Sequence, residues 1–237
     1  MKVREMVTNL KDFVKKTYPK FAPQKNIIIF ESIPDFSDNT KAVFDEMIRR
    51  GLNKKYEMVW GITGSKENLP KIDNVFYLNF FDKKESIKLY LKSTSARCFV
   101  CCNGFNVPYN TSQISFYLSH GTAIKSVRSY YSLPKRINYF LVAAPGVESI
   151  QMKEFEVEKE KLFSLGFPRN DVLTAPRKNV KEYFDGNFEK IIVWYPTFRQ
   201  QKEGVKTAVR NALPILHNEE YTKRLNEIAQ KKVCYWY

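Results

Sequence analysis

The stretch Asn26-Ile27-Ile28-Ile29-Phe30 opens the part of the chain whose pattern decides the fold. This short β-branched run predicts a buried strand. A helix is expected to follow from Asp38 to Arg50, because Asp38, Asn39 and Thr40 can cap its start and Gly51 can end it. A second strand is predicted over residues 56–62. Strand, helix and strand in succession are typical of a crossover unit in a parallel sheet.

The same alternation continues along the chain. Further strands are predicted over residues 75–80, 96–102, 114–119, 139–143 and 161–166. Further helices are predicted over about 82–92, where Asp82 can cap the start, and over 147–157. We therefore predict an α/β fold around a mostly parallel sheet. In such sheets, ligands bind beyond the carboxyl ends of the strands.

Composition and charge narrow the classes of partner. The 237 residues are 43% hydrophobic and carry a formal net charge of +14. This charge predicts attraction to a nucleotide, a nucleic acid, an anionic polymer or an anionic membrane. The sequence has no run of about 18 apolar residues and no apolar signal-peptide core, so we expect no transmembrane helix and a cytoplasmic location.

Three of the four cysteines lie in one predicted strand, Cys98-Phe99-Val100-Cys101-Cys102. Cys98 and Cys101 have a spacing that occurs in zinc sites, but side chains three residues apart on a strand point to opposite faces. We therefore predict buried core thiols and no metal site. Free thiols also favour a cytoplasmic protein.

One of only two histidines lies in a basic part of the chain. No Asp or Glu occurs from Ser86 to Val147, and His120 follows a predicted strand within that interval. Its imidazole could accept a proton near neutral pH, and Gly121 would allow a ligand to approach closely. Thr122 could cap a helix whose N–H groups would face a phosphate. The segment predicts a phosphate-binding crevice that is poor in carboxylates; the alternative is a purely structural histidine.

Other basic residues are candidates for the same crevice. Lys125 and Arg128 have the three-residue spacing that shares one helix face, so they either meet the ligand or form a solvated surface. Arg169 follows Gly166 at the end of a predicted strand, where a planar guanidinium suits phosphate, unless the turn is only structural. His217 lies at a predicted helix start, where a surface or capping role is expected.

Both ends of the chain differ from its centre. The first 24 residues predict a basic amphipathic helix, packed on its own domain or lying on an anionic membrane. Residues 191–195 predict a new strand, followed by Pro196, Thr197 and Arg199, and a helix is predicted over 214–232. Because so few strands cannot form an independent core, residues 188–237 predict the start of an incomplete second domain.

Four motifs occur in the order and setting typical of one family. They are Ser37-Asp38-Asn39-Thr40-Lys41, His120-Gly121-Thr122-Ala123-Ile124-Lys125, Gly166-Phe167-Pro168-Arg169-Asn170-Asp171 and Tyr195-Pro196-Thr197-Phe198-Arg199. On these residues, the chain resembles the CDP-glycerol glycerophosphotransferases, the teichoic-acid primases and polymerases of Gram-positive bacteria. The resemblance implies a GT-B-like fold, with a Rossmann-type acceptor-side domain at 25–187 and the start of a CDP-glycerol-binding domain at 188–237.

The resemblance also implies an activity. Glycerol phosphate, or a related polyol phosphate, would pass from CDP-glycerol to a hydroxyl of a lipid-linked acceptor at the inner membrane face, releasing CMP. His120 would match the family's essential histidine, as general base or as a phosphate-facing group. The substrate-binding residues would be Gly121, Thr122, Ala123, Ile124, Lys125, Arg169, Pro196, Thr197 and Arg199. No cofactor is implied.

Some departures from the family pattern bear on activity. Ala123-Ile124 stands where Pro-Leu is common, and Ser119 stands where an aromatic residue is common. The later Lys-Leu-His-Pro-like and Ser-Asp motifs of the family are absent, so we expect little or no transferase activity from these residues alone. A non-catalytic remnant that binds membrane or a partner through its N-terminal helix is the alternative. A nucleic-acid-binding module is disfavoured, because the aromatic residues fall within apolar strands.

Overall fold

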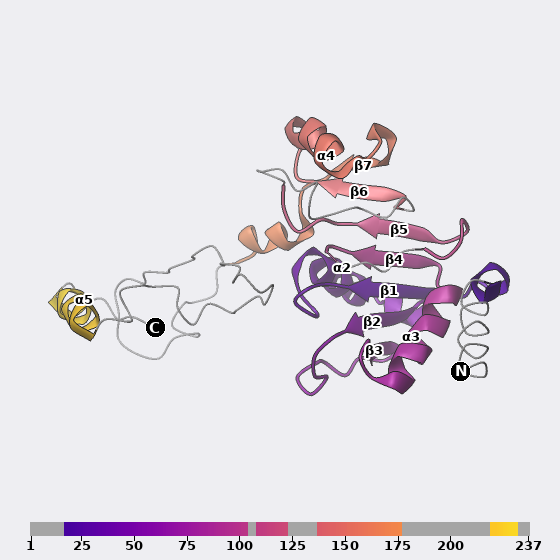
Figure 1. The fold of residues 1–237 in the computed structure, drawn as a ribbon, viewed down its shortest axis with the longest axis horizontal. Helices are drawn as coiled ribbons and strands as arrows, with labels where there is room; N and C mark the ends of the chain where they lie inside the picture. Colours follow the sequence, from indigo (N-terminus) through magenta and orange to yellow (C-terminus); the bar gives the residue numbers. More distant parts are fainter. Residues whose placement is uncertain (1–16, 104–107, 123–136, 177–218, 232–237) are drawn as a thin grey trace, which may run out of the picture. The chain divides into compact units, whose positions relative to one another are not determined.

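The computed structural model describes residues 17–103, 108–122, 137–176 and 219–231. The chain divides into two compact units, Met1–Ala175 and Pro176–Tyr237. The first contains a seven-stranded sheet in the order β3-β2-β1-β4-β5-β6-β7, and every neighbouring pair of strands is parallel (Figure 1). In the second, the described element is α5 (Glu219–Lys231). The predicted domain boundary at 187/188 lies outside the described residues.

The elements match the predicted alternation. The strands are β1 (Ile27–Glu31), β2 (Glu57–Ile62), β3 (Val75–Asn79), β4 (Cys98–Cys101), β5 (Ile114–Tyr117), β6 (Tyr139–Val142) and β7 (Leu162–Ser164). The helices of the first unit are α2 (Asp38–Arg49), α3 (Lys83–Ser95) and α4 (Glu148–Phe155). Short 3-10 turns are η1 (Leu52–Lys54), η2 (Pro145–Val147), η3 (Lys159–Lys161) and η4 (Pro168–Leu173). The predicted α/β class is therefore confirmed.

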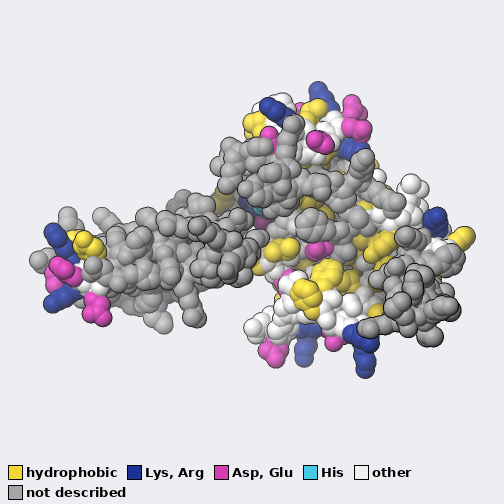
Figure 2. Space-filling view, in the orientation of Figure 1, with side chains coloured by type: hydrophobic (Ala, Val, Ile, Leu, Met, Phe, Trp, Pro, Cys, Tyr) yellow, Lys and Arg dark blue, Asp and Glu magenta, His cyan; other side chains and the backbone are white. Residues whose placement is uncertain are grey.

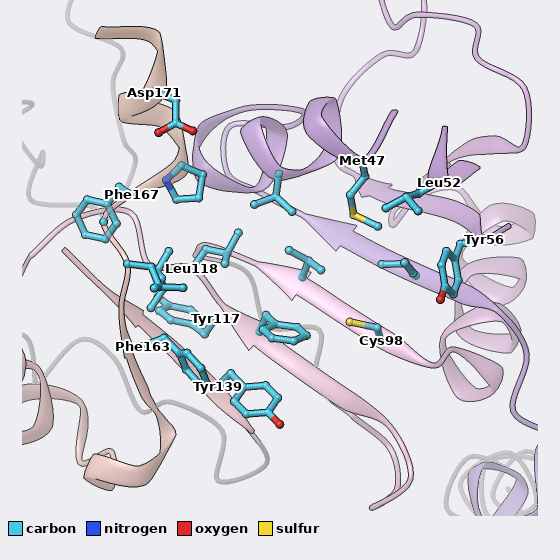
Figure 3. Close-up of a pocket in the computed structure, with 18 of the residues that line it drawn as sticks. Met47, Leu52, Tyr56, Cys98, Tyr117, Leu118, Tyr139, Phe163, Phe167 and Asp171 are labelled. Carbon is cyan, nitrogen blue, oxygen red and sulfur yellow. The ribbon is translucent and has the colours of Figure 1, made fainter. Parts of the chain in front are cut away.

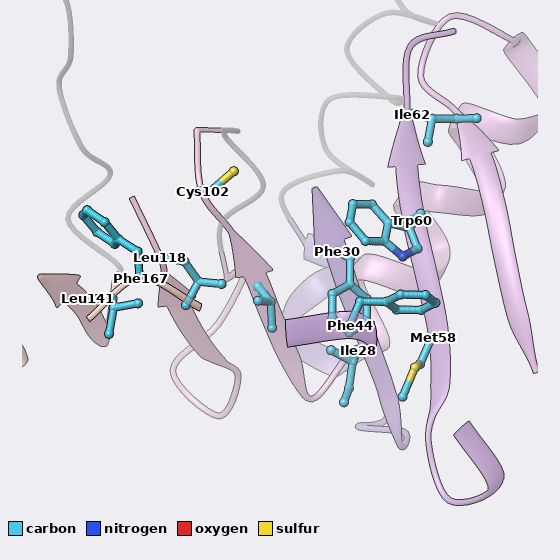
Figure 4. Close-up of a cluster of buried hydrophobic side chains, with 11 residues drawn as sticks. Ile28, Phe30, Phe44, Met58, Trp60, Ile62, Cys102, Leu118, Leu141 and Phe167 are labelled. Carbon is cyan, nitrogen blue, oxygen red and sulfur yellow. The ribbon is translucent and has the colours of Figure 1, made fainter. Parts of the chain in front are cut away.

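Helices cover opposite faces of the sheet because crossovers between parallel strands are right-handed. The chain leaves β1 in one direction through α2 and returns past it through α3, so the two helices must lie on different faces. The rings of Phe30 and Trp60 stack with their centroids 5.4 Å apart, and Phe44 of α2 packs against them (Figure 4). On the other face, Ile29 packs with Leu89 of α3. Aromatic pairs of this kind contribute about 1 kcal/mol each beyond their buried area.

The cysteines of β4 divide between the two faces, as predicted. Cys98 packs against the cluster that contains Phe30, whereas Cys101 packs with Phe140 on the opposite face. Cys101 and Cys102 are buried, but Cys98 is only half-buried, which corrects the prediction of a fully buried set. Desolvation raises the pKa of all three thiols, that of Cys98 to about 12. In the described segments, no cluster of three or more His, Cys, Asp or Glu side chains could hold a metal ion.

Only the end of the predicted N-terminal helix is described. Residues 17–21 are helical, and residues 1–16 lie outside the described part. Asn110 donates from Nδ2 to the carbonyl oxygen of Pro19 at 3.0 Å, and Gln24 donates to that of Ser112 at 2.7 Å. The chain therefore enters the sheet unit beside the loop that precedes β5. None of the described helices has the length and apolar character needed to cross a membrane.

Candidate functional site

His120 lies just beyond the carboxyl end of β5, as predicted. The preceding residue, Ser119, is buried and adopts a left-handed backbone with φ of 54°. Its hydroxyl donates to the carbonyl oxygen of Gly121 at 2.8 Å. A non-glycine residue in this region costs on the order of 1 kcal/mol or more, and such residues concentrate at functional sites. A Cβ atom at Gly121 would meet no atom within 4 Å, so Ser119, and not Gly121, carries the backbone constraint.

Asn39 connects two loops at this end of the sheet. Its side chain is fully buried in the first turn of α2. Nδ2 donates to the carbonyl oxygen of Ser119 at 2.7 Å, and Oδ1 accepts from the backbone N–H of Arg169 at 3.1 Å. The sequence pattern predicted capping roles for Asp38 and Asn39. The N-cap residue is instead Ser37, which makes no capping hydrogen bond through its side chain.

Arg169 is the charged residue that reaches both neighbouring segments. Its Nη1 atom lies 2.7 Å from Oδ1 of Asp38, and Nη2 donates to the carbonyl oxygen of His120 at 2.9 Å. These contacts use two of the five N–H donors of a guanidinium. The acid-free interval in the sequence predicted a crevice poor in carboxylates. That prediction is wrong here, because Asp38 comes from α2 and not from the interval around His120.

The structure brings together part of the predicted site. His120, Gly121, Thr122 and Arg169 lie at the carboxyl edge of the sheet. Nε2 of Gln151, a buried residue of α4, lies 3.5 Å from the carbonyl oxygen of Gly121. The remaining predicted residues lie outside the described residues; they are Ala123, Ile124, Lys125, Arg128, Pro196, Thr197, Arg199 and His217. Asp38 and Asn39 are the contacts that sequence reasoning missed.

An apolar groove of about 760 Å³ begins beside this site, between α2 and strands β4 to β7. Phe167 and Asp171 lie at one end of the groove, and Tyr56 and Cys98 at the other (Figure 3). Among its lining residues only Lys55 and Asp171 are charged. This lining suits an apolar chain or packed side chains. It does not suit the phosphates of a nucleotide, whose candidate position is the polar edge beside Arg169.

The fold defines a Rossmann-type α/β protein, a class in which ligands bind beyond the carboxyl ends of the strands. Residues 14–227 match the family model described as CDP-Glycerol:Poly(glycerophosphate) glycerophosphotransferase. The chain therefore belongs to this family.

Two curated relatives illustrate the relation. The teichoic acid glycerol-phosphate transferase of Staphylococcus aureus is 27% identical over 210 residues, covering 76% of this chain and 52% of the relative. The teichoic acid poly(glycerol phosphate) polymerase of Bacillus spizizenii is 24% identical, covering 84% of this chain and 56% of the relative. The chain thus spans about half the length of these relatives.

Solved structures show the same fold. The wall teichoic acid polymerase TagF is 20% identical with a TM-score of 0.62, covering 83% of this chain and 56% of that chain. A histidine-to-alanine variant of TagF gives a TM-score of 0.67 at 20% identity, covering 94% and 62%. A further TagF variant, soaked with CDPG, gives a TM-score of 0.61 at 20% identity, covering 83% of this chain and 57% of that chain. The expected GT-B-like class is thereby supported.

Proposed function

We propose that this chain is part of an enzyme that transfers glycerol phosphate from CDP-glycerol to a hydroxyl of a membrane-linked acceptor, releasing CMP, in teichoic acid or related polymer synthesis. The observation that carries the proposal is the family match over residues 14–227. The relatives named as teichoic acid transferase and polymerase support the reaction, and the TagF structures soaked with CDPG support the donor.

His120 is the proposed catalytic residue. The acceptor oxygen would form a bond to the β-phosphorus of the donor, the phosphoanhydride bond to CMP would break, and the imidazole would take the proton of the acceptor hydroxyl. Negative charge spreads over the phosphoryl oxygens in such a transfer, and fixed N–H donors and cations stabilise it. Arg169 adds a guanidinium at this edge and holds the loop of His120 through its carbonyl oxygen.

The remaining donor contacts belong to the predicted set. The predicted donor-binding residues are Gly121, Thr122, Ala123, Ile124, Lys125, Pro196, Thr197 and Arg199. Residues 25–187 would form the acceptor-side domain, and residues 188–237 the first part of the donor-binding domain. The transfer would take place at the cytoplasmic face of the membrane, where the net charge of +14 favours contact with anionic lipid.

A transfer assay with radiolabelled CDP-glycerol and a lipid-linked acceptor tests the activity. Because the chain spans about half of its relatives, it is expected to give no turnover alone. A version extended to the length of the relatives should transfer label, and replacing His120 should slow the transfer by about 100-fold or more. Robust turnover by residues 1–237 would contradict the expectation that these residues alone are inactive. An extended protein that binds vesicles but neither binds nor consumes CDP-glycerol would favour the non-catalytic alternative.

A further inference from the structure

Helix α3 carries apolar side chains on two opposite sides. Leu89 faces the sheet and is buried with Ile29 and Val59. Ile87 and Leu91 are four residues apart and so share a face, which points away from the sheet, with exposed fractions of 55% and 45%. Phe81, just before the helix, is 81% exposed. An outward apolar row on a helix that already packs by its other side indicates a surface that meets something apolar.

Positive charges predominate around this row. Lys83, Lys84 and Lys88 are exposed along α3. Both carboxylates at the start of the helix are engaged elsewhere: Asp82 accepts from the backbone N–H groups of Lys84 and Glu85 at 2.9 and 2.8 Å. Glu85 pairs with Lys66 and accepts from the N–H of Asn79. The outer face therefore presents three exposed lysines, and the one carboxylate of the helix start that is not paired with a cation is that of Asp82.

Neighbouring elements extend the same side of the unit. The Nζ atoms of Lys92 and Lys88 lie 4.8 and 5.7 Å from the ring centroid of Phe76 on the edge strand β3. Tyr90 of α3 contacts Tyr109, and the neighbouring residue Asn110 binds the carbonyl oxygen of Pro19. The N-terminal segment thus joins the unit beside α3. In Figure 2, hydrophobic side chains are exposed over the β3–α3 part of the sheet unit, and Lys or Arg side chains project from the same margin.

We propose that the outer face of α3 docks on an anionic lipid bilayer. Phe81, Ile87 and Leu91 enter the boundary between head groups and acyl chains, while the lysines extend to anionic head groups. An apolar row flanked by lysines on a helix parallel to a surface is the pattern that interfacial binding requires. The proposal deepens the proposed membrane association and does not depend on the transfer chemistry.

The test is vesicle co-sedimentation of the whole chain, with phosphatidylcholine alone or mixed with phosphatidylglycerol. The double variant Ile87→Ser with Leu91→Ser should lower partitioning about tenfold, because two apolar anchors are lost. Lys84→Gln with Lys88→Gln should lower binding to anionic vesicles about fivefold per lysine, and should not change binding to phosphatidylcholine. The matched control on α4 is Ile150→Ser, 43% exposed, with Lys153→Gln; it should bind as the unchanged chain does.

Each alternative result overturns the inference. If the α3 variants, shown to be folded by circular dichroism, bind like the unchanged chain, the surface lies elsewhere. If deleting residues 2–16 removes binding while the α3 variants retain it, the proposed membrane association stands and the role of α3 fails. If the unchanged chain binds no anionic vesicle, the proposed membrane association and the role of α3 both fail. If the apolar variant removes only self-association, measured by analytical ultracentrifugation, the face meets a second copy and not lipid.

Discussion

Nη2 of Arg169 lies 2.9 Å from the carbonyl oxygen of His120, so a side chain from the turn after β7 holds the backbone of the loop after β5. The same guanidinium binds Asp38 at the start of α2. Three segments that are remote in sequence therefore meet through one residue. Because the contact to His120 is through a main-chain atom, its strength depends on Arg169 and not on the identity of residue 120.

Neutralising Asp38 and Arg169, singly and together, should reveal a measurable coupling energy between the two side chains. Both side chains are partly shielded, 39% exposed for Arg169 and 15% for Asp38, so we expect a coupling of about 1 kcal/mol between Asp38→Asn and Arg169→Gln. Urea unfolding of the two single variants and the double variant measures it. The exposed pair Lys41–Asp45 is the control and should give about 0.5 kcal/mol or less. Additive effects of Asp38→Asn and Arg169→Gln would contradict the structure.

Asn39→Ala should destabilise the unit more than most polar substitutions. The buried amide bonds to the carbonyl oxygen of Ser119 and to the N–H of Arg169, and removing it leaves both backbone groups without that partner. We expect a loss of about 2–3 kcal/mol in the free energy of unfolding. Asn53→Ala, which removes an exposed hydrogen bond to Asp73, should cost about 1 kcal/mol or less. Equal costs for the two variants would count against the bridging role of Asn39.

Replacing His120 tests the proposed chemistry separately from stability. In a version of the protein long enough to transfer glycerol phosphate, His120→Ala should lower kcat by about 100-fold or more, because a positioned general base contributes that much. CDP-glycerol binding, measured by calorimetry, should change much less. His217→Ala is the matched control and should leave the rate unchanged. A kcat of His120→Ala within a few-fold of the original would remove His120 from the catalytic role.

The sequence predicted the sheet unit well because each element has a local signal. The β-branched run at Ile27, the cap at Asp82 and the glycine after α2 mark ends that depend on nearby residues alone, and the structure bears them out. The side chain of Asp82 accepts from two backbone N–H groups, as a capping residue should. Even the divergence of Cys98 and Cys101 followed from strand periodicity.

Contacts between distant segments were harder to predict. The carboxylate beside Arg169 was missed because it is separated from Arg169 by 131 positions, and acid-free spacing along a chain says nothing of what folds against it. Asn39 was interpreted locally as a cap, since Asn favours caps. Asn39 belongs to the family motif at residues 37–41, and that motif was the signal that could have placed Asn39 at the site.

Alkaline pH should weaken the fold through the thiol of Cys98. Burial raises its pKa from 9.0 to about 12, so the folded state holds the proton more tightly than the unfolded chain. This contribution to stability is fully present below pH 9.0 and is lost as the pH rises toward 12. Urea unfolding at increasing pH should show the decline, and Cys98→Ser should make it shallower because serine does not titrate there. Cys234→Ser serves as the control, and an identical pH dependence for both variants would show that Cys98 is not the group responsible.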